Sequence, residues 1–281
     1  MCREFFQMAG RAGRRGMDPD GDVYVRVNPH EVALPDVLRV VHGRPEPVRS
    51  RFNTAYATLL NLYRRYQRKL LEIYPKTFHH FQASAHQRHE GVNFIERKLT
   101  LLSSLGYLEE QGLTPKGEFA SWMYGYELML SELHAQGVLN DLSDVWLNVL
   151  LIGLVFEPRR GMVLTRPHHM GRKLEAACEP IVATVHRLER KLRVYPRTKV
   201  PQFHLAAAME AWSQGGTFDK VVELAGVDEG ELVRYFRMVI QLLRQLSHAP
   251  VASEPLRAVA SQGLKRINRD VVDAEQQLRR G

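Results

Sequence analysis

Residues 217–247 read TFDKVVELAGVDEGELVRYFRMVIQLLRQLS, and this stretch decides the fold class because it specifies two helices and the turn between them. Thr217 can cap a first helix that Gly226 ends, and Asp228 can cap a second, with Glu231 at the capping-box position. The second helix, residues 228–247, carries an apolar face of Leu232, Val233, Phe236, Val239 and Leu243. The pattern predicts a helix-turn-helix packed within a larger helical body.

The same helix carries a polar row at spacings of three, four and three residues, namely Arg234, Arg237, Gln241 and Arg244. An arginine row along one helix face is suited to following a phosphate backbone. Helix-turn-helix units also serve as ordinary packing elements. The row alone therefore leaves nucleic-acid binding and simple packing open.

The chain around this stretch is mostly helical by periodicity and capping signals. Downstream of residue 117 the sequence predicts helices at about 118–136, 143–156, 170–194, 203–213 and 254–278, which form a bundle over residues 118–281. Upstream, helices are expected at 49–71, 75–86 and 93–105, with Asn93 as the cap of the third. Two very short strands follow within 107–117, and helices followed by a small hairpin predict a winged helix over residues 49–117. The fold class is mainly α.

Four histidines, His79, His80, His86 and His89, cluster near the second of these helices. A metal site needs converging ligands of fixed geometry. No cysteine or carboxylate stands at ligand spacing beside them, so no metal is expected.

Composition indicates the kind of partner. The 281 residues carry a formal net charge of +8, which favours a polyanion, most simply nucleic acid. The apolar run 145–156 is too short to span a bilayer, so no membrane association is expected. Two cysteines suit a reducing cytoplasm rather than a disulfide framework.

Near the N-terminus, residues 7–16 read QMAGRAGRRG. Glycines let backbone N–H groups approach a ligand, and arginines match phosphate oxygens, so a phosphate site is one interpretation. A solvated basic arm is the other. The alternating residues 22–27 predict a strand, the remnant of an α/β sheet within residues 1–48.

The longer stretch QMAGRAGRRGMDPDG, residues 7–21, resembles motif VI of superfamily two helicases, and more closely that of the DExH-box RNA helicases of the superkiller and exosome-associated type. The resemblance implies that residues 1–48 are the edge of a RecA-like domain facing ATP. It implies that Gln7 orders the γ-phosphate and attacking water, that Arg11 and Arg14 are arginine fingers, and that Gly10 and Gly13 form part of the nucleotide site.

Further landmarks extend the resemblance along the chain. Residues 52–62 contain an F-x-x-x-Y-x-x-x-L-N-L run, and residues 137–143, 216–218 and 267–272 resemble the family's C-terminal helical (DSHCT) domain. The resemblance implies that helix 228–247 is a ratchet helix contacting single-stranded RNA, with Arg234 and Arg237 as its main contacts. It also implies ATP and Mg²⁺ as cofactors of the full-length enzyme. The span 74–91 has no room for the arch domain of the exosome-associated members.

The chain contains neither a G-x-x-x-x-G-K-[ST] phosphate loop nor a D-E-x-[DH] metal-binding pair. Because phosphoryl transfer needs both, the chain alone is expected to be inactive and to bind no cofactor. We expect it to be the C-terminal part of an ATP-dependent RNA helicase, with single-stranded RNA, or DNA, and the missing RecA-like domains as partners. The alternatives are a stand-alone nucleic-acid-binding winged helix and a protein-interaction scaffold.

Overall fold

The computed structural model describes residues 2–13, 16–18, 20–44, 46–50 and 55–273. By its internal contacts the chain divides into two units, residues 1–51 and residues 52–281. We call them unit 1 and unit 2 and describe each by itself.

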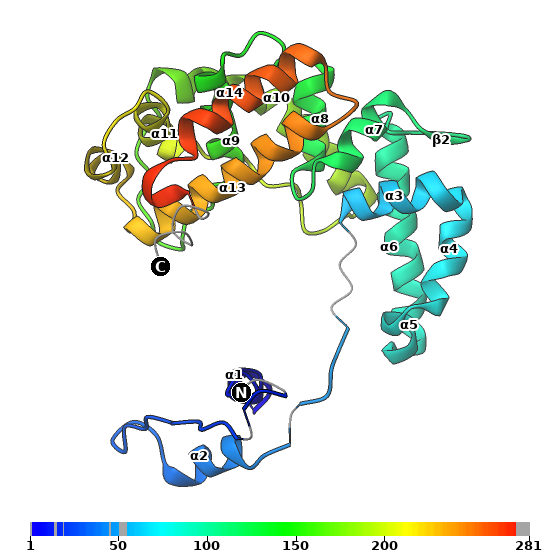
Figure 1. The fold of residues 1–281 in the computed structure, drawn as a ribbon. Coiled ribbons are helices and arrows are strands. Elements are labelled where there is room, and N and C mark those ends of the chain that lie inside the picture. Colours follow the sequence, from blue (N-terminus) through cyan, green and yellow to red (C-terminus); the bar gives the residue numbers. More distant parts are fainter. Residues whose placement is uncertain (1, 14–15, 19, 45, 51–54, 274–281) are drawn as a thin grey trace. The chain divides into compact units, whose positions relative to one another are not determined.

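The regular elements of unit 2 are nearly all helices (Figure 1), as the sequence predicts. Its one described sheet is a two-stranded antiparallel hairpin, with Leu108 opposite Leu113. The elements run in the order α3 Tyr56–Tyr66, η1 Gln67–Lys69, α4 Leu70–Ile73, η2 Tyr74–Lys76, α5 Phe78–Gln82, α6 Ala85–Ser104, β1 Leu108–Glu109, β2 Gly112–Leu113, α7 Pro115–Trp122, α8 Glu127–Ala135, α9 Asp144–Val155, α10 His169–Leu192, η3 Phe203–Leu205, α11 Ala206–Ser213, α12 Phe218–Ala225, α13 Glu229–His248, α14 Glu254–Ile267 and η4 Asp270–Val272. The helices-then-hairpin order over residues 56–113 is the order that the sequence predicts.

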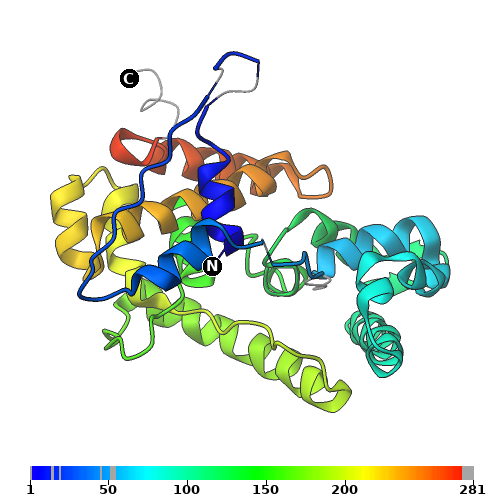
Figure 2. The same ribbon diagram turned by 90° about the horizontal axis from the view of Figure 1, so that it is seen from below.

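Two hydrophobic cores hold unit 2 together. The smaller core lies among α3, α6 and the hairpin, and the larger lies among the helices from α7 to α14. Helix α10 belongs to both, because Cys178 and Ile181 enter the larger core whereas Val185 enters the smaller one. Figure 2 shows α10 as the long yellow-green helix that leaves the bundle toward α6. A single 24-residue helix thus joins the two cores.

Helix α9 is the centre of the larger core, since every residue from Leu147 to Val155 is buried. Close approach by its neighbours depends on two glycines. A Cβ on Gly153 would lie 2.3 Å from the Phe203 ring, and one on Gly263 would lie 2.6 Å from Oδ1 of Asn148. The Asn148 side-chain NH2 group donates to the Gly263 carbonyl at 3.3 Å and to the Ser213 hydroxyl at 3.1 Å, so this buried donor group is satisfied.

Several expected helix limits are wrong. Asn93 does not begin a helix: α6 begins at Ala85, where Ser84 and Gln87 form a complete capping box. The helix expected at 49–71 starts only at Tyr56 and gives way to a 3-10 turn after Tyr66. The expected helix 118–136 is two helices, α7 and α8, separated at Gly125, whose φ is +90°. The last helix ends at Ile267 rather than 278.

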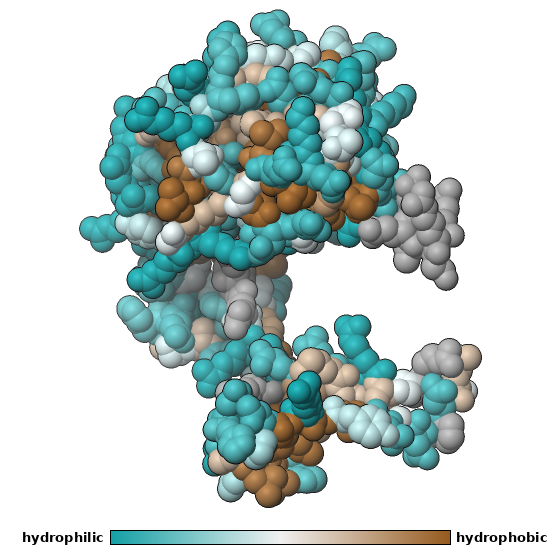
Figure 3. All heavy atoms as spheres, turned by 90° about the vertical axis from the view of Figure 1, so that its left-hand side faces the viewer, coloured by the Kyte–Doolittle hydropathy of each residue, from teal (hydrophilic) through white to brown (hydrophobic). Residues whose placement is uncertain are grey.

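Unit 1 contains α1, Cys2–Ala9, and α2, Leu34–Val41, which pack together. The Glu46 carboxylate accepts from the N–H groups of Cys2 at 3.1 Å and Arg3 at 2.7 Å, at the start of α1. Backbone hydrogen bonds, led by that of Glu46 itself, lower the pKa of this carboxyl to about 2. None of the described residues of unit 1 is buried, and Figure 3 shows apolar residues at its surface.

The strand expected at 22–27 does not form, because these residues have no regular secondary structure. A strand needs a neighbour to complete its hydrogen bonds, and none of the described residues of unit 1 forms one. Tyr24 is 91% exposed and Val25 is 48% exposed, so neither side chain is packed into a core.

Candidate nucleic-acid interface

Helix α13 presents one buried face and one polar face. Its buried face, which includes Leu232, Phe236, Val239 and Leu243, packs on α9 and α14. The predicted row Arg234, Arg237, Gln241 and Arg244 lies off this face: Arg234, Gln241 and Arg244 are exposed and Arg237 is half-buried. The fold thus brings the four predicted side chains to one side of a single rigid helix.

Arg234 is held by its own helix. Its guanidinium lies 4.3 Å from the centre of the Tyr235 ring and 3.7 Å from a Glu231 oxygen. Its side chain stays 57% exposed. A guanidinium stacked on a buried ring is pre-oriented yet keeps donors available for an anion.

Arg237 has a structural role that its sequence position does not reveal. Its Nε donates to the Val272 carbonyl at 3.1 Å and its Nη2 to the Val271 carbonyl at 3.4 Å, so it fastens η4 to α13. Of the two arginines that the resemblance favours, Arg234 is therefore the more available for a ligand.

The capping box expected at the start of α13 is absent. Neither Thr217 nor Asp228 makes a side-chain cap hydrogen bond. Instead Arg159, from the loop after α9, lies 3.4 Å from Asp228 and 3.0 Å from Glu231. The carboxylates that the sequence assigns to capping are thus engaged by an arginine that lies 69 residues before Asp228.

Arg159 and Arg234 also line a cavity of about 620 Å³ at this end of α13, together with Glu157, Pro158, Gly230, Glu231 and Tyr235. The loop of residues 157–167, whose first three residues line the cavity, is anchored at two points. The Tyr235 hydroxyl donates to the Glu157 carbonyl at 2.8 Å, and His204 Nδ1 accepts from the Thr165 N–H at 3.1 Å. Burial lowers the pKa of His204, which favours the neutral ring that this acceptor role requires. Arg159, Arg160 and Arg166 make this loop basic, but the sequence does not show where the loop lies.

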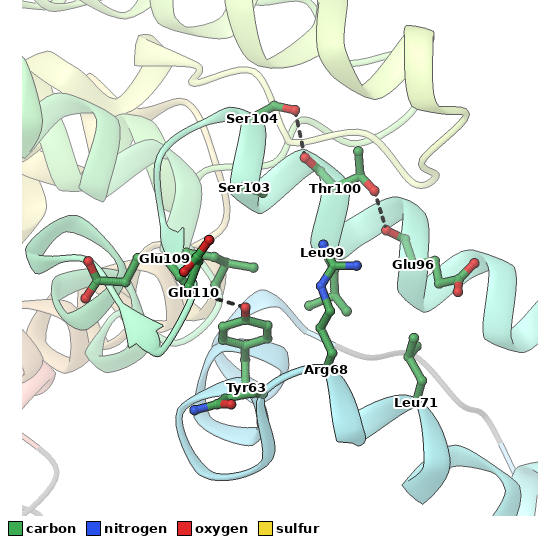
Figure 4. Close-up of a pocket in the computed structure, with 12 residues that line it drawn as sticks. Tyr63, Arg68, Leu71, Glu96, Leu99, Thr100, Ser103, Ser104, Glu109 and Glu110 are labelled. Atoms are coloured by element: carbon green, nitrogen blue, oxygen red, sulfur yellow. Dashed lines mark hydrogen bonds between the residues drawn. The ribbon is translucent and has the colours of Figure 1, made fainter.

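One groove of unit 2 is unsuited to a polyanion. It measures about 880 Å³ and lies between α3–η1, α6 and the hairpin (Figure 4). Glu96, Glu109 and Glu110 line it, against one cation, Arg68. Two of its hydroxyls are engaged within α6: Thr100 donates to the Glu96 carbonyl at 2.9 Å and Ser104 to the Thr100 carbonyl at 2.8 Å. Among the described residues, the polar face of α13 is the better surface for phosphate.

In unit 1, the structure places three of the glycine-arginine residues on a tight turn. Gln7 lies in α1 and is exposed, Gly10 N–H donates to the Phe6 carbonyl at 2.8 Å, and exposed Arg11 follows. Gly13 has φ of +77°, a conformation that favours glycine. The expected arginine finger Arg14 lies outside the described residues.

The described residues contain no group of three or more histidine, cysteine or carboxylate side chains placed to hold a metal ion. No helix among them is long and apolar enough to cross a membrane. Cys2 and Cys178 are both free, and burial raises the pKa of the Cys178 thiol to about 12.

Known proteins have matches to this helical body. The DSHCT (NUC185) domain family matches residues 110–275, more than half of the chain. Superkiller complex protein 2 of Homo sapiens is 32% identical over 123 residues, which are 42% of this chain and 10% of that protein. Exosome RNA helicase MTR4 of Homo sapiens is 29% identical over 154 residues, 53% of this chain and 15% of that protein. The chain therefore spans only a small part of the length of these relatives.

Proposed function

This chain belongs to the DSHCT (NUC185) domain family, and from that premise we propose that it is the C-terminal part of an ATP-dependent RNA helicase that acts in RNA processing or decay. Its relatives are named as an exosome RNA helicase and a superkiller complex protein. In this proposal unit 2 provides a channel for single-stranded RNA, and α13 is the helix that contacts the strand.

The observation that carries the proposal is the exposed polar row of α13, set on a body that matches the family. Arg234 and Arg244 are exposed on this helix, with half-buried Arg237 between them. Arg159 lies at the start of the helix, where it is paired with Asp228 and Glu231. Contacts of exposed arginines with RNA phosphates are electrostatic and tolerate any RNA sequence.

For the ATP half, we propose that Gln7, Arg11 and Arg14, with Gly10 and Gly13, complete a nucleotide site whose Mg²⁺ and phosphate-binding residues come from RecA-like domains outside this sequence. The glycine turn fits such a role because Gly13 adopts a left-handed conformation next to exposed Arg11. Arginines placed this way stabilise charge on a transferred phosphoryl group.

Two free cysteines are compatible with the cytoplasmic location that we propose.

The RNA contact is tested by fluorescence anisotropy of a labelled oligouridine with the purified chain. Affinity should fall steeply as salt rises, and Arg234→Ala/Arg244→Ala should weaken binding about tenfold and flatten the salt dependence. Arg237 is left intact because it fastens η4.

The matched control is Arg187→Ala/Arg190→Ala, which removes the same charge from two exposed positions three residues apart on α10. It should bind RNA like the wild type. Equal losses in both double variants would mean that only net charge matters and would remove α13 from the interface. A flat salt dependence would favour the protein-interaction scaffold instead.

A further inference from the structure

The short helix α5 lies at the end of α4 and α6 that points away from the bundle (Figure 1). It carries two exposed phenylalanines. Phe78 is 51% exposed and Phe81 is 76% exposed. Their rings are nearly parallel, with an interplanar angle of 17° and centroids 6.3 Å apart. Both rings therefore lie on one side of the same helical turn, and each is at least half exposed to solvent.

Several hydrogen bonds hold this turn in place. The Thr77 hydroxyl accepts from the His80 N–H at 3.3 Å at the start of α5. At its end, Arg88 of α6 donates to the carbonyls of His80 at 3.0 Å and Phe81 at 3.4 Å. The turn is thus fixed at both ends, and its exposed rings are pre-organised rather than loosely attached.

Beneath the turn, Tyr74 completes the support. Its hydroxyl lies 2.8 Å from Nδ1 of His79, and the side chain is buried. A Cβ at Gly91 of α6 would lie 1.9 Å from that hydroxyl, so the tyrosine fits only because residue 91 is glycine. Tyr74 is therefore buried beneath α5, whereas Phe78 and Phe81 are exposed on it.

The segment that carries the two rings has no acidic residue, and carboxylates flank it only at Glu72 and Glu90. From Tyr74 to His89 the sequence has no aspartate or glutamate, but it contains Lys76, Arg88 and four histidines. The nearest carboxylate downstream, Glu90, lies 3.3 Å from Arg97. This composition is complementary to a polyanion.

We propose that α5 and its supports form a base-stacking platform for single-stranded RNA, a second contact separate from α13. Flat aromatic rings beside cations are the means by which proteins bind single strands without reading their sequence. A protein-binding patch would be a broader apolar surface. Phe78 and Phe81 are instead the only large apolar side chains that are exposed among the described residues 74–91. The platform rests on the proposed function, because its ligand is the same single-stranded RNA, but its residues are different from those of α13.

The first test separates base stacking from charge. Labelled oligouridine and an abasic oligomer of equal length and charge are titrated with the wild type and with Phe78→Ala/Phe81→Ala. The variant should lose at least about fivefold in affinity for oligouridine. Its affinity for the abasic oligomer should be unchanged. The control Tyr124→Ala removes a 56% exposed aromatic side chain elsewhere and should alter neither affinity.

The second test locates the contact. Oligouridine carrying 5-iodouridine is photocrosslinked to the chain, and crosslinked peptides are identified by mass spectrometry. Crosslinks at Phe78 or Phe81 support the platform, and they should persist in Arg234→Ala/Arg244→Ala. Oligouridine binding that is untouched by Phe78→Ala/Phe81→Ala, with crosslinks elsewhere, overturns the platform and leaves the α13 proposal standing. Crosslinks at α5, together with unchanged RNA affinity of the α13 variant, would retain the platform and remove α13 from the interface.

Discussion

Lys98 of α6 is the most unusual ionisable residue in the contact between the two cores. Its side chain is almost completely buried, and its ammonium lies 4.8 Å from the ring centres of both Tyr56 and Phe94. Burial lowers the pKa of Lys98 to about 8, although Glu127 and Glu189 act in the opposite direction. Glu189 is itself fully buried and accepts from the Thr198 N–H at 2.9 Å. The lysine therefore holds its proton less tightly in the folded protein than in the unfolded chain.

This pKa difference predicts that the stability of the protein rises with pH in the alkaline range. Between pH 8 and the ordinary lysine pKa of about 10.4, the unfolded chain binds a proton that the folded protein has lost, so the free energy of unfolding rises with pH. From pH 7.5 to 9.5, we expect wild type to gain about 1–2 kcal/mol in urea unfolding. Lys98→Met should lack this gain. An identical rise in Lys98→Met would show that another group is responsible.

Local signals predict those residues whose partners are close in sequence. Ser143 caps α9 by accepting from the Trp146 N–H, as its position three residues earlier indicates. Asp228 has equally good capping chemistry but is engaged by Arg159. Arg237 fits the polar row yet fastens η4. Competition from distant residues is invisible in a single sequence.

At the scale of elements, a similar conflict divides the expected helix 118–136. Met123 is fully buried, and the Glu127 carboxylate at the start of α8 accepts from the Ala57 N–H of α3 at 3.1 Å. The burial of Met123 and the hydrogen bond of Glu127 both arise from tertiary packing. The left-handed conformation of Gly125 lets the chain turn between α7 and α8. The glycine is a signal in the sequence, but only the packing shows that it is used.

The loop of residues 157–167 allows a prediction at this scale. The Tyr235 hydroxyl both donates to the Glu157 carbonyl and accepts from the Glu157 N–H, at 2.8 Å and 3.3 Å. Tyr235→Phe removes both bonds while keeping the ring under Arg234. We expect a loss of about 1–2 kcal/mol in stability and faster tryptic cleavage after Arg159 and Arg160.

Limited proteolysis followed by mass spectrometry measures this effect. Tyr124→Phe changes an exposed hydroxyl in another loop and serves as the control. Cleavage after Arg159 at the wild-type rate in Tyr235→Phe would mean that His204 and Arg159 hold the loop without the tyrosine.

At the scale of the whole molecule, the two units differ in how well the sequence predicts them. Unit 2 buries its apolar faces within itself, so periodicity alone indicates a helical bundle. Unit 1 has no buried residue among those described, and its alternating segment 22–27 forms no strand. Period-two alternation specifies a strand only where a neighbouring strand is present. The polar row of α13 is predictable because all its members lie on one helix, whereas its link to Arg159 is not.

This difference leads to a prediction about which unit affects ATP hydrolysis and which unit binds RNA. The chain alone should show no RNA-stimulated ATP hydrolysis, because phosphoryl transfer needs a phosphate cradle and a metal ligand that its sequence lacks. In a longer enzyme that supplies RecA-like domains, Arg11→Ala should lower kcat for ATP hydrolysis on the order of 10³-fold, since an arginine finger acts on the transition state. It should leave RNA affinity close to that of the wild type.

Arg234→Ala/Arg244→Ala should have the opposite effect, because it weakens RNA binding while the rate of ATP hydrolysis at saturating RNA is retained. Steady-state kinetics and anisotropy on the two variants measure both quantities, and a loss of RNA affinity equal to the loss of kcat in Arg11→Ala would place the glycine-arginine turn on the RNA rather than on the nucleotide.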